Sequence, residues 1–392
     1  MAVKVAELAS WVRERLLLRN EASRAFFPGE AVPLAEACQK MAERFLRGGR
    51  LLAFGKGPYA TDAQHVSVEF VHPVIVGKRA LPALDLSLDF WPWLQALLRP
   101  EDMVMGFGPP EGDEEVSQAL VWAQARGAQT FALPGTRGDY AVRAPAADPF
   151  VHQELLEILY HTLWETVHVF FEHRELGHEV GPAGFLYPSL GQVRQDTRGV
   201  VGEVAASIQA KAEEDERLRM KVAQEEAETL AELIQAIGSR LAQGGKLLLF
   251  GNGGSATDAN DFAIDCVNPP PGWRPIPAVS LALEPAVLSA LANDVGAEVI
   301  FLRQIHAQAR PEDVAIGIST SGGSKNVLLA LEEARRRGLL TVALLGYDGG
   351  EVVRQGLAHF PLVVRSDYIP RIQEVQASVY HVIREGLEVY LG

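Results

Sequence analysis

The sequence predicts an α/β protein built from two copies of one domain. Each copy is expected to be a parallel β-sheet between two layers of helices, a three-layer αβα arrangement of the flavodoxin-like kind. Two observations lead to this fold class. A long stretch of the chain recurs, in the same order, in its second half. Each copy also alternates short apolar runs with Gly-rich turns and helical patterns, which is typical of parallel strands covered by helices on both faces.

Three blocks of sequence carry the repeat. The first reads RFLRGGRLLAFGKGPYATDAQHVSVEFVHP in one copy and RLAQGGKLLLFGNGGSATDANDFAIDCVNP in the other. The second begins RPEDMVMGFGPPEGDEEV and RPEDVAIGISTSGGSKNV, and a weaker third pairs FVHQELLEILYH with RIQEVQASVYH. Because all three recur in the same order, we infer a duplicated domain. The blocks cover 44–73 and 240–269, 99–138 and 310–349, and 150–161 and 371–381.

Each copy supplies three expected strands. They are RLLAF, DMVMGF and QTFALPG in the first copy, and KLLLF, DVAIGI and LTVALLG in the second. Short, continuous apolar runs that end at a turn indicate strands buried on both faces. A stretch rich in Gly, Pro and polar residues separates the copies. We therefore predict a first domain over 1–173, a linker over 174–203 and a second domain over 204–392.

Composition narrows the class of protein. The chain has 392 residues and a net charge of −14, which argues against binding to nucleic acid or to an anionic membrane. Two cysteines, Cys38 and Cys266, provide neither a disulfide framework nor a Cys-based zinc site. The N-terminal stretch has the pattern of an amphipathic helix rather than a signal peptide, and no run is long and apolar enough to span a bilayer. We expect a cytoplasmic protein.

Two loops of the second copy are candidates for binding a phosphate group. GNGGSATDA (251–259) and STSGGS (319–324) each follow an expected strand and open a helix, where N–H groups and the helix dipole favour an anion. Gly and Ser also make ordinary turns and caps. Two such loops at the carboxyl ends of neighbouring strands favour a ligand site instead. The candidate residues are Asn252, Gly253, Ser255, Ser319, Thr320, Ser321 and Ser324.

The corresponding loops of the first copy have different chemistry. GNGGS is replaced by GKGPY, and STSGGS by GPPEGD, so prolines and carboxylates stand where hydroxyl groups stand in the second copy. Carboxylates repel a phosphate, so we expect no phosphate site in this copy, although Lys56 compensates in part. No Lys of the P-loop type follows the two loops of the second copy, so a nucleoside triphosphate site is a poor fit and we expect no nucleotide cofactor.

These motifs, with NDVGAEVIFLRQI and RIQEVQASVYHVI, closely resemble the phosphoheptose isomerases of the SIS (sugar isomerase) domain superfamily. The resemblance covers essentially all of the second half and part of the first. It implies two tandem SIS domains, the N-terminal one degenerate. It also implies conversion of sedoheptulose 7-phosphate into D-glycero-D-manno-heptose 7-phosphate through an enediol(ate). The family's phosphate lies on the Ser/Thr loop, and Glu284 stands where the family usually has Asp.

The family's acid–base and metal positions are a His and a Glu four residues apart, and a Gln and a His eight apart. The first copy keeps this set, which implies zinc, although Gln153 and His161 could instead be ordinary interface residues. In the second copy Asp261 replaces the His and Asp265 the Glu, a departure from the zinc pattern. The resemblance thus implies proton transfer by His381 and Asp265, or by Glu69 and His161. The two sets are His65, Glu69, Gln153 and His161, and Asp261, Asp265, Gln373 and His381.

Two hypotheses for function follow from the resemblance. The first is a phosphosugar isomerase that acts as a homo-oligomer, with two chains giving four SIS domains. The second is a phosphosugar sensor without catalytic activity, or a protein-interaction module of the type that binds the bacterial replication initiator. The changes at Asp261 and Asp265 favour the second hypothesis, and the intact Ser/Thr loop favours ligand binding.

Overall fold

The computed structural model describes residues 4–73, 78–176 and 197–392. The chain divides into two compact units. We call residues 21–216 the first unit, and residues 1–20 together with 217–392 the second unit. Most of the predicted linker, 177–196, lies outside the described residues, and the domain boundaries predicted from the repeat stay a prediction.

The first unit contains a sheet of five parallel strands in the order β2-β1-β3-β4-β5. This is the 2-1-3-4-5 order of flavodoxin-like folds, as predicted. In β1, which lies between β2 and β3, Leu51 pairs with Ala83 on one side and with Met103 on the other. The strands are β1 (Leu51–Phe54), β2 (Ala83–Asp85), β3 (Met103–Phe107), β4 (Gln129–Leu133) and β5 (Tyr140–Ala141).

The second unit repeats this topology. Its five parallel strands lie in the order β10-β9-β8-β6-β7, which is the same order read from the other edge. Leu247 in β6, which lies between β7 and β8, pairs with Ala278 and Val314, and this repeats the register of Leu51 in the first unit. The strands are β6 (Leu247–Phe250), β7 (Ala278–Ser280), β8 (Val314–Ser319), β9 (Leu340–Gly346) and β10 (Phe360–Val364).

Helices flank each sheet. The first unit has α2 (Ala60–Val71), α3 (Phe90–Leu97), α4 (Glu114–Gln124), α5 (Pro149–Leu176) and the 3-10 turn η1 (Gly57–Tyr59). The second has α7 (Ala227–Ala242), α8 (Gly254–Val267), α9 (Pro285–Asp294), η4 (Ala297–Val299), α10 (Ile300–Gln308), α11 (Lys325–Arg336), α12 (Gly350–Arg354) and α13 (Ile369–Leu391). The division between the units falls within α1 (Val5–Leu46) and α6 (Thr197–Glu225). None of the described helices is long and apolar enough to cross a membrane.

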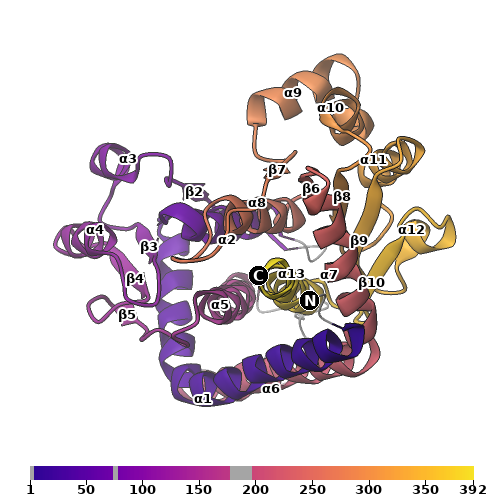
Figure 1. Cartoon of the computed structure of the whole chain (residues 1–392). Coiled ribbons are helices and arrows are strands. Elements are labelled where there is room, and N and C mark those ends of the chain that lie inside the picture. Colours follow the sequence, from indigo (N-terminus) through magenta and orange to yellow (C-terminus); the bar gives the residue numbers. More distant parts are fainter. Residues whose placement is uncertain (1–3, 74–77, 177–196) are drawn as a thin grey trace. The chain divides into compact units, whose positions relative to one another are not determined.

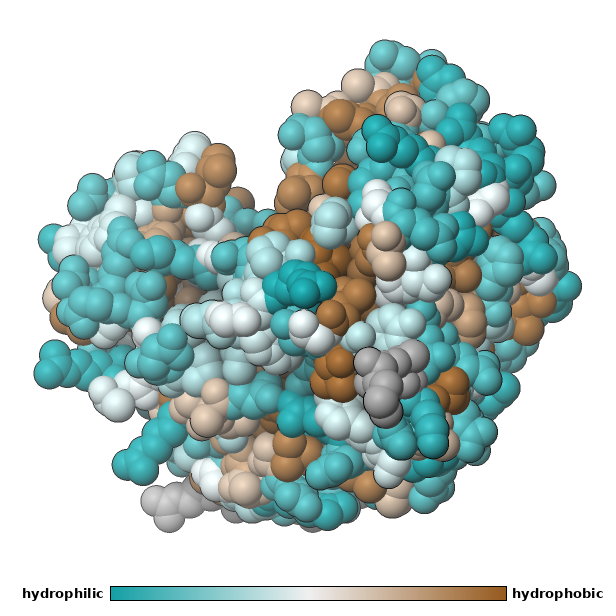
Figure 2. Space-filling model, viewed as in Figure 1, coloured by the Kyte–Doolittle hydropathy of each residue, from teal (hydrophilic) through white to brown (hydrophobic). Residues whose placement is uncertain are grey.

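Alternate residues of each strand point into two separate cores, which gives the three layers. In the second unit, Leu247 and Leu249 pack with α7, α8 and α13, while Leu248 and Phe250 pack with α10 and α11 on the other face (Figure 1). The first unit follows the same rule around β1. Strands buried on both faces explain the continuous apolar runs of the sequence. Hydrophilic residues cover most of the visible surface over α10 and α11 (Figure 2).

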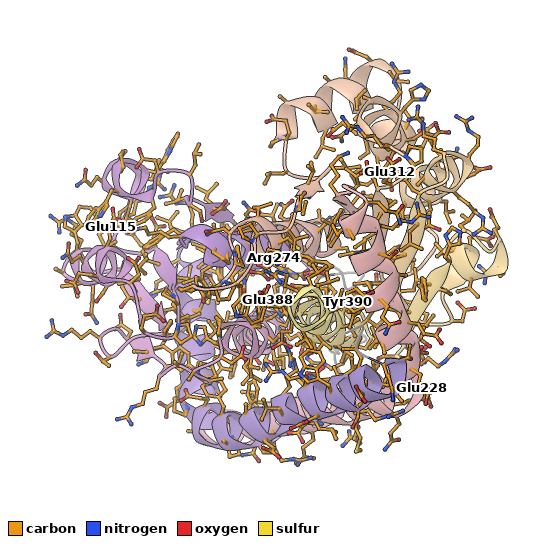
Figure 3. The ribbon with its side chains drawn as sticks, in the orientation of Figure 1. Glu115, Glu228, Arg274, Glu312, Glu388 and Tyr390 are labelled. Carbon is orange, nitrogen blue, oxygen red and sulfur yellow. The ribbon has the colours of Figure 1, made fainter. Side chains whose placement is uncertain are left out.

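The end of α13 is anchored to its own unit by two contacts (Figure 3). The backbone N–H of Arg274 donates to the Glu388 carboxylate at 3.2 Å. Tyr390 packs so closely on α7 that a Cβ at Gly238 would collide with its ring. These contacts hold the end of the helix that carries His381 against α7 and the segment after α8.

Candidate functional site

The Ser-rich loop of the second unit joins β8 to α11 at the carboxyl end of the sheet. Ser319 ends β8 and is buried, and its hydroxyl oxygen accepts a hydrogen bond from Gly322 N at 3.2 Å. The Ser324 hydroxyl lies 3.3 Å from that of Ser319, and Ser321 Oγ accepts from Gly323 N at 3.2 Å. The loop thus gathers three of the predicted hydroxyl groups around one turn of backbone.

The start of α11 has no side-chain cap. Ser324 occupies the N-cap position with extended backbone (φ −63°, ψ 114°), but its side chain makes no capping hydrogen bond. The first N–H groups of a helix have no partner within the helix, and together with the helix dipole they favour an anion. The geometry at this position is therefore suited to a phosphate group.

Backbone contacts fix the shape of this loop. Gly322 has φ +59°, and a Cβ there would collide with the carbonyl oxygen of Gly349 in the turn after β9. A Cβ on Gly350 would likewise collide with the carbonyl oxygen of Ser321. Val352 N donates to the Gly322 carbonyl at 3.1 Å. Only glycine is compatible with this approach, because the two turns touch through main-chain atoms.

The Gly-rich loop after β6 is tied to the same helix start. Asn252 and Asn326 form a reciprocal amide pair, in which each Nδ2 donates to the other Oδ1 at 2.9 Å. Gly253 precedes α8 with φ +59° and ψ −126°, a conformation that glycine tolerates. Ser255 is buried in the first turn of α8. The structure thus brings the two predicted loops together.

Three other predicted residues lie in different surroundings. Thr320 is half-buried in the loop, where its carbonyl accepts from Gly346 N at 2.9 Å. Glu284 is exposed and caps α9, with its carboxylate accepting from Ala286 N at 3.1 Å. Gln373 is buried on α13, and its Oε1 has no hydrogen-bond partner among the described residues. Their roles in binding a ligand stay predictions.

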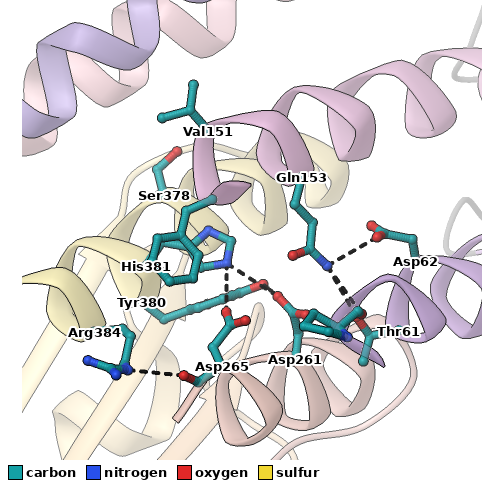
Figure 4. A network of polar contacts seen from close by, with 12 residues as sticks. Thr61, Asp62, Val151, Gln153, Asp261, Asp265, Ser378, Tyr380, His381 and Arg384 are labelled. Carbon is teal, nitrogen blue, oxygen red and sulfur yellow. Dashed lines mark hydrogen bonds and ion pairs between the residues drawn. The ribbon is translucent and has the colours of Figure 1, made fainter. Parts of the chain in front are cut away.

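A second cluster of the second unit lies where α8 packs on α13. Nε2 of His381 is 3.1 Å from Asp265 Oδ2 and 3.3 Å from Asp261 Oδ2, and all three side chains are buried (Figure 4). The Tyr380 hydroxyl donates to Asp261 Oδ2 at 2.8 Å. Asp261 and Asp265 are four residues apart on α8, so they share one helix face.

Burial dominates the electrostatics of this cluster. It raises the pKa of Asp265 to about 7, with a further rise from the Asp261 carboxylate and an opposing effect of His381. Arg384 is close, but its Nε donates to the backbone carbonyl of Asp265 at 3.0 Å rather than to the carboxylate. A carboxyl group with a pKa near neutrality is suited to take up and release a proton.

The first unit replaces the amide pair by an ion pair. Lys56, at the position of Asn252 in the repeat, places Nζ 2.7 Å from Glu115 Oε2, and Glu115 is at the position of Asn326. Both side chains are about half exposed, so this pair adds little stability. It does occupy the Lys56 ammonium, which the sequence suggested as a substitute anion ligand.

The first unit also caps the helix that corresponds to α11. Asp113, at the position of Ser324, accepts a hydrogen bond from Val116 N at 3.0 Å with its own carboxylate. An aspartate at this position satisfies a free N–H group and complements the helix dipole. The anion position of the first unit is therefore filled by a side chain of the protein itself.

The first unit brings together three of its four predicted metal ligands. Nε2 of His161 lies 3.2 Å from Nε2 of His65, and His65 Nε2 lies 3.8 Å from Glu69 Oε1. All three side chains are buried. Gln153 lies nearby on α5, and its amide nitrogen donates to Asp62 Oδ2 at 3.1 Å (Figure 4).

Comparison with known proteins adds to this geometry. The family model described as the SIS domain matches residues 212–346. The phosphoheptose isomerase of Aquifex aeolicus is 42% identical over 163 residues, which are 41% of this chain and 84% of that protein. The chain belongs to the phosphoheptose isomerase family. The phosphoheptose isomerase of Thermodesulfovibrio yellowstonii is 38% identical over 187 residues, 47% of this chain and 92% of that protein.

A solved structure supports the fold over almost the whole chain. The C-terminal domain of glucosamine-fructose-6-phosphate aminotransferase from Francisella tularensis aligns with a TM-score of 0.54 and 10% identity. The alignment covers 99% of this chain and 94% of that one. At this identity the likeness concerns the fold alone. It agrees with the tandem SIS arrangement predicted for this member of the phosphoheptose isomerase family.

The residues of the first unit fit the zinc ion that the phosphoheptose isomerase resemblance implies. Two ligands of a tetrahedral zinc at 2.0–2.1 Å are roughly 3.3 Å apart, and the two imidazole nitrogens of His65 and His161 are 3.2 Å apart. Glu69 completes three ligand atoms that all lie within 4.8 Å of one another. Buried imidazole and carboxylate groups are typical zinc ligands.

Sequence reasoning missed two residues that shape the site of this phosphoheptose isomerase relative. Tyr380 bonds to Asp261, and Asn326 pairs with Asn252. The repeat contained a signal for the tyrosine, because both copies have Tyr directly before the His of the last helix. Asn326 had no such signal, because Glu115 takes its place in the first copy.

Proposed function

We propose that the chain is an aldose–ketose isomerase that converts sedoheptulose 7-phosphate into D-glycero-D-manno-heptose 7-phosphate. Membership of the phosphoheptose isomerase family supports this reaction class. The observation that carries the proposal is the start of α11, which lacks a side-chain cap and is surrounded by the hydroxyl groups of Ser319, Ser321 and Ser324. Such a site fits the phosphate group that all substrates of this class share.

One helix connects the phosphate loop with the acid–base cluster. Ser255 lies in the first turn of α8, and Asp261 and Asp265 lie about 9 and 15 Å farther along its axis at 1.5 Å per residue. A phosphosugar anchored at the loop and extended along this helix would bring its far end to the carboxylates. The distance suits a long-chain sugar phosphate better than a triose phosphate.

The reaction requires only proton transfers. A base removes a proton from C1 of the ketose, and the electron pair forms the C1–C2 double bond of an enediol(ate). A proton is then returned to C2, and the hydroxyl proton on O1 is lost while O2 gains one, so the sugar is neither oxidised nor reduced overall. In the second unit, Asp265 and His381 are the groups for these steps. In the first unit they are Glu69 and His161.

Zinc would be held by His65, Glu69 and His161 of the first unit, with Gln153 nearby. A zinc ion supplies a Lewis acid that polarises a carbonyl or hydroxyl oxygen. Each Nε2 of the two histidines faces the other, so a hydrogen bond between them requires one Nε2 without a proton, and a zinc ion held by both would require both without one.

The test is incubation of the purified protein with sedoheptulose 7-phosphate, with and without added zinc, followed by NMR detection of the aldoheptose 7-phosphate. Two matched variants identify the base, because Asp265→Asn and Glu69→Gln occupy equivalent positions of the repeat. We expect the variant that removes the base to lose turnover by at least about a hundredfold. If the wild type binds the sugar phosphate but forms no product under either condition, the isomerase proposal is wrong.

A second candidate function is a phosphosugar sensor or protein-interaction module without turnover. One observation favours it. Asp261 stands where the family has an imidazole, and the Tyr380 hydroxyl engages its carboxylate. A thermal shift with sugar phosphates but no product would support this alternative. The homodimer of four SIS domains and the cytoplasmic location also stay predictions, and sedimentation at micromolar concentration tests the first of these.

A further inference from the structure

The turn that joins β9 to α12 holds a tyrosine in a backbone conformation that usually requires glycine (Figure 1). Tyr347 has φ +51°, and among the residues that the structure describes it is the one non-glycine residue with a positive φ. Gly349 N donates to the Gly346 carbonyl at 2.9 Å, so Tyr347 is the first central residue of a closed turn. Glycine is typical there when φ is positive. Bulky residues in this conformation are strained and are found mostly at functional sites.

The other copy of the domain shows that the fold does not need this conformation. The repeat aligns ALPGTRG (132–138) with ALLGYDG (343–349), so Thr136 occupies the position of Tyr347. Thr136 is not among the residues with a positive φ. The first unit fills its anion position with the Asp113 carboxylate, whereas the second unit leaves the start of α11 without a side-chain cap. The strained tyrosine therefore accompanies the open anion position and is missing where that position is filled.

Main-chain contacts join this turn to the Ser-rich loop. Gly346 N donates to the Thr320 carbonyl at 2.9 Å, and Val352 N donates to the Gly322 carbonyl at 3.1 Å. Tyr347 directly follows the residue that makes the first of these bonds. The backbone of Tyr347 is therefore held next to the loop that we propose as the phosphate site, where the neighbouring strands β8 and β9 end.

The side chain of Tyr347 lies on the sheet face that carries the acid–base cluster. It is half-buried and packs against the core of α7, α8 and α13, whereas α11 packs on the other face. Burial raises the pKa of Tyr347, and the Asp367 carboxylate just before α13 raises it further, so the hydroxyl stays protonated at neutral pH. This hydroxyl makes no hydrogen bond to the described residues, which leaves a donor available to a ligand.

We propose that Tyr347 contacts the sugar part of a bound sugar phosphate, with its hydroxyl donating to an oxygen of the polyhydroxy chain. This inference rests on the proposed function, because it takes the Ser-rich loop as the phosphate site. From that loop a sugar reaches His381 and Asp265 only on the face of α8 and α13, where Tyr347 also lies. Tyr347 is then a specificity-determining residue. Its fixed backbone directs one donor at one part of the sugar, so a sugar without an oxygen there binds more weakly.

The experiment is calorimetric titration of the full chain with sedoheptulose 7-phosphate and, separately, with inorganic phosphate. Tyr347→Phe keeps the ring and removes the donor, and is expected to weaken binding of the sugar phosphate roughly five- to tenfold. Tyr347→Gly also removes the ring, and is expected to weaken it by at least about tenfold. Both variants should bind inorganic phosphate as the wild type does. Thr136→Ala, the matched control in the first unit, should leave both affinities unchanged.

The outcomes separate this inference from the proposed function. If the wild type binds sedoheptulose 7-phosphate and Tyr347→Phe binds it equally well, the inference is wrong and the proposed function is unaffected. If both variants lose affinity for inorganic phosphate as much as for the sugar phosphate, Tyr347 shapes the loop without contacting the sugar, which also overturns the inference. If the wild type binds no sugar phosphate, the inference and the proposed function fail together. Circular dichroism checks that each variant is folded.

Discussion

Removing the carboxylate of Asp113 should destabilise the start of α4, whereas the matched change Ser324→Ala should not destabilise α11. Asp113 accepts a hydrogen bond from Val116 N at 3.0 Å, and Ser324 makes no capping bond. Loss of an N-cap side chain costs about 1 kcal/mol, and loss of a negative charge at the helix start costs about 0.3–1 kcal/mol more. The expected cost of Asp113→Ala is therefore about 1–2 kcal/mol. Ser324→Ala should cost less than about 0.5 kcal/mol.

Hydrogen exchange followed by mass spectrometry measures the local stability of α4 and of α11 in each variant. A cost of 1–2 kcal/mol corresponds to roughly 5- to 30-fold faster exchange where local opening limits it. We expect this acceleration in the first turn of α4 for Asp113→Ala. For Ser324→Ala we expect unchanged exchange in α11 without ligand, but weaker protection by a sugar phosphate. Equal acceleration in both variants would refute the reasoning, because it would mean that Ser324 is a structural cap.

Three further predictions concern other parts of the molecule. Gly322→Ala should weaken sugar phosphate binding by at least about tenfold in calorimetry. Alanine is strained at φ +59°, and its Cβ would collide with the turn after β9, so the loop would have to move. His152 is buried, and burial lowers its pKa to about 4 from the ordinary value of 6.5. The unfolded chain therefore takes up a proton at this residue before the folded protein does, and the free energy of unfolding falls by up to roughly 3 kcal/mol as the pH drops from about 6.5 towards 4. Urea titrations of His152→Gln should show a flatter pH dependence in that window. Gly238→Ala should lower the unfolding free energy by about 1–3 kcal/mol through overpacking against Tyr390, and Tyr390→Ala in the same chain should make the substitution nearly neutral.

The sequence predicted the inner strands of both sheets and missed the outer ones. β1, β3 and β4, and their counterparts β6, β8 and β9, are continuous apolar runs because both faces are buried. The strands β2, β5 and β7 have only two or three residues, too few for a pattern. β10 is an edge strand that is buried on alternate residues only and contains Pro361.

The candidate site was predicted in its residue types but not in its pairings. The resemblance to the phosphoheptose isomerases named the sets around His161 and His381, and the repeat indicated which residues of the two sets occupy equivalent positions. Side-chain pairing depends on rotamers and on neighbours far apart in sequence, such as Tyr380 with Asp261. The use of Glu284 as a helix cap was likewise not predictable, because the same residue type can cap a helix or contact a ligand.

The contact between the Ser-rich loop and the turn after β9 affects how ligand preference can evolve in this protein family. The two segments meet through glycines and main-chain carbonyls, and Thr320 joins this contact through its own carbonyl, so the form of the loop does not depend on the side chain at Thr320. Substitutions at Thr320 can then change which sugar substituents fit beside the loop while its main-chain contacts stay in place. Such a scaffold allows new ligand preferences to be acquired by single amino-acid changes, which is how one backbone can come to serve several sugar phosphates.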